Sequence, residues 1–202
     1  MKIYFDGCSM TRGGLFLGKN WETDRWSKIL CDKLGAEEYN YADGGGSNQR
    51  ILRQLTTHNI KDYDLAIIQL TMPERLEYHD GNIFQKISPS ISLNSKKINN
   101  LNWFWNTYYK QVYHDAYGDA MEKMVYDSVK CICAVNKVPL VLMSGWHDTK
   151  LSYDLMITSK IFDGKYDPVG GTRPHYDAHP DVLSQPFIAD DIINFINITS
   201  VL

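Results

Sequence analysis

The fold is decided by a short apolar run, DLAIIQL at residues 64–70. A strand that is apolar almost throughout suits the centre of a parallel sheet, where helices cover both faces. Similar runs occur at residues 2–6 and 138–143, and a shorter strand candidate lies at residues 37–41. These four segments predict the strands of one buried sheet.

Segments with helical periodicity separate these strands. Residues 22–34 space their apolar side chains like an amphipathic helix that ends at Gly35. The other predicted helices are one capped by Ser47, a pair within 103–135 that Gly118 divides, and one at 181–198. Strands that alternate with helices predict an α/β fold of the flavodoxin-like kind, a three-layer α/β/α sandwich with a central, mainly parallel sheet.

Length and composition are those of one globular domain. The chain has 202 residues, 44% of them hydrophobic, and we expect a single domain over 1–202 with an irregular, aromatic insertion around 79–118. The net charge of -3 and the lack of a basic run predict no nucleic-acid partner. The polar start and the absence of an apolar run of ~20 residues predict a soluble, cytoplasmic protein without a membrane partner. We expect reduced thiols, mostly in the core, at the four cysteines, Cys8, Cys31, Cys131 and Cys133.

Three segments carry residues suited to nucleophilic catalysis. Ser9 directly follows the first strand, and active sites of parallel sheets lie at the carboxyl ends of their strands. His179 lies near Asp177 before the last helix, and a histidine beside a carboxylate is the general base that a serine needs. The glycines at 44–46 offer backbone N–H groups to a developing negative charge. Taken singly, each segment also fits an ordinary turn, cap or loop.

Together the three segments resemble the SGNH (GDSL-type) hydrolases. Residues 7–11 (GCSMT) resemble the first block of that family, residues 40–48 (NYADGGGSN) the second, and residues 177–180 (DAHP) the last. The resemblance implies an esterase of this fold with Ser9 as nucleophile, His179 as base and Asp177 orienting the imidazole. It also implies an oxyanion hole that contains the backbone N–H groups of Ser9 and a glycine, best aligned with Gly45, with Gly44 and Gly46 as alternatives.

The sequence departs from the family pattern at three points. Cys8 replaces the usual aspartate before the nucleophile, and we expect its side chain to point toward the core. Pro73 stands where the third block has an asparagine that completes the oxyanion hole, so Asn48, Thr71 or Arg75 would have to substitute, or the hole has two donors. One residue rather than two separates Asp177 from His179.

Other patterns provide alternatives to this interpretation. His175 and His179 have the spacing of a metal pair, but Pro174 and Pro180 favour an extended loop, so we expect no metal and no cofactor. Substrate contacts are predicted at Arg75, Trp146 and His147. The aromatic run at 103–117 fits either core packing or a substrate-binding rim.

The leading functional prediction is hydrolysis of a small-molecule or glycan ester, with an O-acyl group on a carbohydrate as the favoured substrate. The missing asparagine at Pro73 motivates a second reading, a non-catalytic binding or structural module that retains the hydrolase fold. The same serine could also transfer its acyl group to a sugar or another alcohol. The sequence leaves the oligomeric state open.

Overall fold

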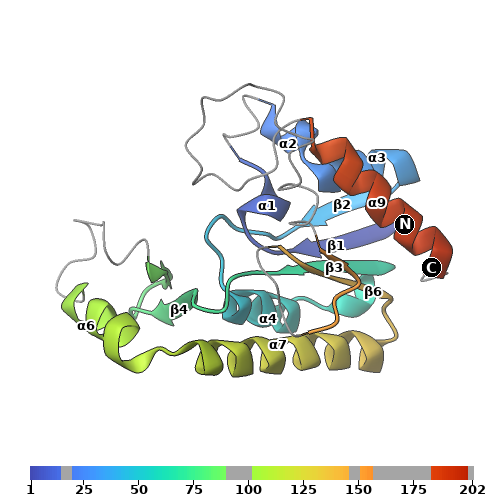
Figure 1. Cartoon of the computed structure of the whole chain (residues 1–202). Coiled ribbons are helices and arrows are strands. Elements are labelled where there is room, and N and C mark those ends of the chain that lie inside the picture. Colours follow the sequence, from blue (N-terminus) through green and yellow to red (C-terminus); the bar gives the residue numbers. More distant parts are fainter. Residues whose placement is uncertain (15–19, 90–101, 146–150, 157–182, 200–202) are drawn as a thin grey trace.

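The computed structural model describes residues 1–14, 20–89, 102–145, 151–156 and 183–199 (Figure 1). These residues form a five-stranded parallel sheet in the order β2-β1-β3-β6-β7. Its strands are β1 (Lys2–Asp6), β2 (Glu37–Asn40), β3 (Leu65–Leu70), β6 (Leu140–Ser144) and β7 (Leu155–Met156). The run that decides the fold is therefore the central strand, and the predicted parallel sheet is confirmed.

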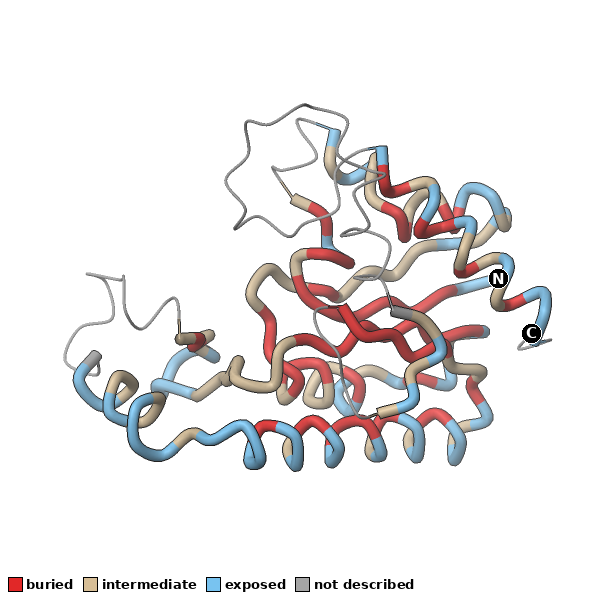
Figure 2. Tube along the Cα trace, viewed as in Figure 1, coloured by how far each residue is buried: buried red, intermediate tan, exposed pale blue. Residues whose placement is uncertain are grey.

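Helices cover both faces of the sheet. On one face α3 (Trp26–Leu34) and α9 (Gln185–Thr199) pack against Ile3 and Phe5 of β1. On the other face α4 (Asn48–Thr57) and α7 (Asp115–Asn136) pack against Tyr4 and its neighbours in the sheet. Successive side chains of a strand point to opposite faces, so one apolar strand serves both cores. Figure 2 shows the resulting buried centre, and the three-layer α/β/α sandwich is confirmed.

Two helix ends lie at the capping residues that the sequence predicts. The hydroxyl of Ser47 accepts a hydrogen bond of 3.2 Å from the Arg50 N–H and caps α4. Gly35 ends α3 with a left-handed φ of 62°. The predicted helix at 22–34 is nevertheless divided, because Arg25 adopts an extended conformation between α2 (Trp21–Asp24) and α3.

The segment around 79–118 is more regular than the sequence suggested. β4 (Leu76–His79) and β5 (Phe84–Ile87) form an antiparallel hairpin, followed by α6 (Asn102–Thr107) and the π-helix η3 (Tyr108–Val112). Long-range contacts stabilise the hairpin: Arg53 of α4 forms an ion pair of 2.8 Å with Glu77. Local sequence could not reveal this pairing, so the expectation of an irregular insertion around 79–118 was wrong for residues 84–87, which form β5.

Gly118 does not divide two helices, and that prediction was wrong. It is buried inside α7, and the chain leaves helical geometry earlier, at Tyr113 and His114. A Cβ at Gly118 would lie 2.1 Å from the Tyr113 hydroxyl oxygen. The glycine therefore serves the close packing of a tyrosine rather than a helix end.

The cysteines differ in exposure. Cys8, Cys31 and Cys133 are buried free thiols, whereas Cys131 is exposed on α7. Most of the cysteines thus lie in the core, as predicted, and Cys131 is the exception because its position in α7 faces solvent. Among the described residues, no helix combines the length and apolar character needed to cross a membrane.

We predict that Ile67→Ala lowers the free energy of unfolding by about 2–5 kcal/mol, because it opens a cavity in the middle of β3. Ile67 is fully buried, whereas Ile198 of α9 is 83% exposed. Ile198→Ala is therefore the matched control, with a change of less than about 0.5 kcal/mol. Urea unfolding followed by circular dichroism measures both values. Similar losses for the two variants would contradict the placement of β3 at the centre.

Candidate active site

Ser9 begins a short helix immediately beyond the first strand. β1 ends at Asp6, and Cys8 precedes α1 (Ser9–Arg12) in an extended conformation. The Cys8 carbonyl accepts hydrogen bonds from the N–H groups of Thr11 and Arg12, at 3.1 and 2.9 Å. Ser9 is half-buried at the carboxyl edge of the sheet. The turn thus holds a hydroxyl at a helix N-terminus, where backbone N–H groups favour negative charge.

A buried amide lies beneath this turn. The Thr11 hydroxyl donates a hydrogen bond of 2.6 Å to Oε1 of Gln69, and Nε2 of Gln69 lies 3.3 Å from the Cys8 sulfur. Gln69 and Cys8 are both fully buried, as expected for a Cys8 side chain that points inward. Sequence reasoning passed over Gln69, although its polar side chain within the apolar run of β3 was an available signal.

Gln69 is accommodated by glycines on both sides. A Cβ at Gly145, just beyond β6, would lie 1.8 Å from the Gln69 Nε2 atom. A Cβ at Gly7 would lie 3.1 Å from the Gln69 side chain and 2.7 Å from the Thr11 hydroxyl. The amide therefore fills a space that the ends of β1 and β6 leave open.

The glycine-rich loop after β2 is hydrogen-bonded to the same turn. The Asp43 N–H donates to the Gly7 carbonyl at 3.2 Å, and the Gly46 N–H donates to the Asp43 carbonyl at 2.9 Å. Gly45 has a positive φ of 71°, which favours glycine. Since the Gly46 N–H bonds within the loop, Gly45 and Gly44 are the better candidates for an oxyanion donor.

A buried ion pair underlies both segments. Asp6 is fully buried, and its carboxylate lies 2.7 Å from Nη1 of Arg50 and accepts a 2.7 Å hydrogen bond from the Gly7 N–H. Arg50 also donates to the Tyr41 carbonyl at the end of β2. Burial raises the pKa of Asp6 to about 7, while the Arg50 guanidinium and the Gly7 N–H act in the opposite direction. The pair links β1, β2 and α4 below Ser9.

Asp43 of the same loop forms ion pairs with several basic side chains. Its carboxylate lies 2.5 Å from Nζ of Lys86 on β5 and 3.4 Å from the guanidinium of Arg12. Arg50 approaches the same carboxylate at 3.8 Å. Lys86 also donates to the Gly44 carbonyl at 2.9 Å. The β4–β5 hairpin thereby holds the glycine-rich loop from outside the sheet.

Thr71 directly follows β3 and is hydrogen-bonded to two other predicted site residues, Asn48 and Arg75. Its N–H donates to Oδ1 of Asn48 at 2.7 Å, and Nδ2 of Asn48 donates to the Thr71 carbonyl at 2.9 Å. The Thr71 hydroxyl accepts a 2.9 Å hydrogen bond from Arg75 and keeps its own proton for a further acceptor. Pro73 lies in the turn that follows, where it supplies neither an N–H nor a side-chain donor. Asn48 thus positions Thr71, and Arg75 orients its hydroxyl.

These contacts bring Ser9, Gly45, Asn48, Thr71 and Arg75 to the carboxyl edge of one sheet. The predicted residues Trp146, His147, Asp177 and His179, and the alternative metal pair that includes His175, lie outside the described residues. Among the described residues, no group of three or more potential metal ligands is suitably placed to hold an ion.

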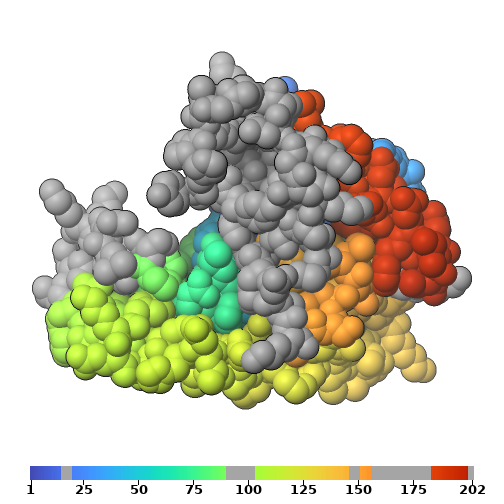
Figure 3. All heavy atoms as spheres, viewed as in Figure 1, coloured from blue at the N-terminus to red at the C-terminus, as the bar shows by residue number. Residues whose placement is uncertain are grey.

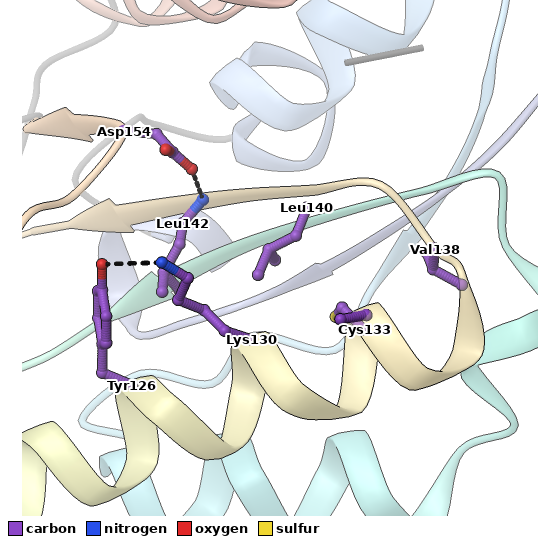
Figure 4. Close-up of a pocket in the computed structure, with 8 residues that line it drawn as sticks. Tyr126, Lys130, Cys133, Val138, Leu140, Leu142 and Asp154 are labelled. Carbon is purple, nitrogen blue, oxygen red and sulfur yellow. Dashed lines mark hydrogen bonds between the residues drawn. The ribbon is translucent and has the colours of Figure 1, made fainter.

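A separate cavity of about 290 Å³ lies between α7 and β6 (Figure 4). Asp154 accepts a 2.7 Å hydrogen bond from the Leu142 N–H beside it, and Lys130 lies 3.5 Å from the Tyr126 hydroxyl. Val138, which also lines the cavity, precedes the amino end of β6. The cavity is therefore distinct from the site around Ser9.

No family model matches the chain, and no curated protein matches its sequence. Solved structures do resemble it. One is the esterase EstA from Pseudoalteromonas sp., in a structure inhibited by monoethylphosphonate. It is 15% identical with a TM-score of 0.54, and the match covers 97% of this chain and 96% of the esterase chain.

Two further solved structures are similar over almost their whole length. The acetyl xylan esterase AlAXEase is 14% identical with a TM-score of 0.55, and 96% of this chain covers 98% of that one. A protein of the G-D-S-L family from Desulfitobacterium hafniense is 10% identical with a TM-score of 0.55 and the same coverage. The architecture is thus a three-layer α/β sandwich with candidate site residues at its carboxyl edge. More specifically, the chain has an SGNH hydrolase-like fold, as the sequence resemblance predicted.

We predict that Arg50→Met lowers the free energy of unfolding by about 3–5 kcal/mol, because it leaves the Asp6 carboxyl buried without its cation. Lys123 of α7, in an exposed ion pair of 2.7 Å with Asp127, is the matched control. Lys123→Met should give no measurable loss, since exposed pairs contribute little. Denaturant unfolding tests both. Equal, small effects would show that Asp6 does not depend on Arg50.

We predict that Gly145→Ala destabilises the protein by about 1–3 kcal/mol, because the new methyl group displaces the Gln69 amide. In a Gln69→Ala background the same change should cost close to nothing, since the colliding atom is gone. Gly44→Ala is the control, as its Cβ would make an ordinary contact of 3.6 Å with Arg12. A cost for Gly145→Ala that is the same in both backgrounds would disprove the steric coupling.

Proposed function

We propose that the protein hydrolyses an ester through Ser9, with His179 as general base and Asp177 orienting the histidine. The observation that carries the proposal is the hydrogen bond from the Asp43 N–H to the Gly7 carbonyl, which joins the glycine-rich loop to the turn that contains Ser9. This hydrogen bond joins the segment that carries the Ser9 hydroxyl to the loop that carries the Gly44 and Gly45 N–H groups, which supports an oxyanion hole between them. The fold shared with known esterases supports the same reaction class.

In the proposed mechanism Ser9 Oγ attacks the ester carbonyl carbon while His179 accepts the hydroxyl proton. The oxyanion is bound by the backbone N–H groups of Ser9 and Gly45. His179 then gives its proton to the leaving alcohol, and the acyl group stays on Ser9. Water, deprotonated by His179, attacks the acyl-enzyme, and Ser9 regains its proton as the acid leaves.

Thr71 and Asn48 supply the third side of the proposed oxyanion hole. The Thr71 hydroxyl, held by Arg75 at 2.9 Å, is the better side-chain donor. The side-chain carbonyl and one amide N–H of Asn48 are hydrogen-bonded to the Thr71 backbone, so Asn48 acts mainly by positioning Thr71. Trp146 and His147 remain proposed substrate contacts.

The proposed substrate is a small-molecule or glycan ester, with an O-acyl group on a carbohydrate as the favoured type. An acetyl xylan esterase is among the proteins of similar fold, which supports that choice at the level of the fold. The alternative is a binding module without turnover. Pro73 favours it, because the turn after β3 lacks the asparagine donor that completes the oxyanion hole in the family pattern.

A serine-directed fluorophosphonate probe tests the proposal. Wild-type protein should be labelled at Ser9, Ser9→Ala should not react, and His179→Ala should react slower by a factor of at least about 10⁴. Ser128→Ala, which changes a serine on α7, serves as the control and should react like the wild type. Circular dichroism must show that all variants are folded.

Two results would contradict the assignment. The first is equal labelling of wild type and Ser9→Ala, which would put the reactive group elsewhere. The second is an unreactive wild type that also fails to cleave p-nitrophenyl esters, which would favour the binding module.

A further inference from the structure

A cavity of about 560 Å³ lies just beyond the carboxyl end of β3. The turn that contains Met72, Pro73 and Glu74 forms one wall, and Tyr109 and Tyr113 form another. Figure 3 shows β4, α6 and the beginning of α7, in green and yellow-green, extending beyond this end of the sheet. The volume falls in the range of small-molecule sites, and the turn begins one residue after Thr71.

The aromatic walls of this cavity are held by specific contacts. The Tyr109 hydroxyl donates a 2.7 Å hydrogen bond to the Glu74 carbonyl, and the Tyr109 and Tyr113 ring centroids are 5.9 Å apart. Tyr109 lies in the π-helix η3, a rare geometry that is frequent at functional sites. Gly118 admits the Tyr113 ring, since a Cβ there would lie 2.1 Å from its hydroxyl oxygen and 3.4 Å from Pro73.

The charge of the cavity is negative. Three carboxylates line it, those of Glu74, Asp115 and Asp119, and no lysine or arginine is among the described lining residues. Asp115 lies in the first turn of α7 and offsets the partial positive charge of that helix end. Burial raises the pKa of Tyr113, and the negative charge of these three carboxylates raises it further. The direction of this pKa shift agrees with a negative potential at the tyrosine ring.

We propose that this cavity binds an alkylammonium group, held by the tyrosine ring faces and the surrounding carboxylates. Ring faces attract cations through their quadrupole, and this attraction is strongest where water is partly excluded. The methylene and methyl groups of such a cation also suit the apolar walls at Met72 and Pro73. A preference for esters whose alcohol part carries a positive charge follows, and that consequence rests on the proposed function.

The test compares choline with 3,3-dimethyl-1-butanol, a neutral molecule of the same shape. Binding is followed by the shift of the methyl proton resonance in NMR titrations, since ring currents move it upfield. Choline should bind about tenfold more tightly than its neutral counterpart. Glu74→Gln and Asp119→Asn should each weaken choline binding about threefold to tenfold, as the loss of one nearby unit charge that water partly screens predicts.

Two control variants separate this site from the hydrolase. Asp127→Asn removes a carboxylate from α7 outside the cavity and should leave choline binding unchanged. Ser9→Ala should also bind choline normally, so that a failure of the proposed esterase activity does not affect the result. Equal affinity for choline and the neutral alcohol overturns the proposal. So does an unchanged affinity in both Glu74→Gln and Asp119→Asn, or a loss of binding in Ser9→Ala.

Discussion

A carboxylate without solvent contact, Asp6, closes the first strand, and the Arg50 guanidinium lies 2.7 Å from it. A buried ion pair needs hydrogen bonds for both of its members, and here the pair and its hydrogen-bond partners come from separate parts of the chain. Arg50 belongs to α4 and also binds the Tyr41 carbonyl after β2, while the Gly7 N–H comes from the turn before Ser9. The charge therefore requires these segments to meet at one place.

Next to the Asp6–Arg50 pair, buried polar side chains rather than apolar ones position the segments of the candidate site. Gln69 engages Thr11 and Cys8 from the central strand, and Asn48 binds both backbone groups of Thr71. Such groups are oriented by hydrogen bonds with directional geometry, so they position backbone more narrowly than apolar contacts do. The turn that carries the proposed nucleophile rests on a hydrogen-bonded amide and is therefore pre-organised, as stabilisation of a transition state would require.

Much of the fold could be predicted because its signals are local. The apolar run of β3, the Ser47 cap and the Gly35 terminator depend on residues a few positions apart. β5 was missed because it depends on a distant partner, with Lys86 paired to Asp43. The role of Gly118 was also missed, although Tyr113 is close to it in sequence, because the contact depends on how the tyrosine ring packs. Short-range periodicity does not report such contacts.

The candidate site divides in the same way. Ser9 and Gly45 could be predicted from strand ends and glycine patterns, and the fold brings their segments together. Gln69 and Arg50 were not predicted, because their roles arise from packing between strands and helices that are far apart in sequence. The roles of Asp177 and His179 rest on the sequence pattern and stay predictions.

The ion pairs of Asp43 differ in how strongly salt weakens them. Its contacts with Arg12 and Lys86 are partly open to solvent, whereas Arg50 approaches it from the buried side. In 1 M salt the Debye length falls to about 3 Å, so the outer two contacts weaken while the inner one is largely preserved. High ionic strength therefore weakens the attachment of the glycine-rich loop to Arg12 and Lys86 more than its attachment to Arg50.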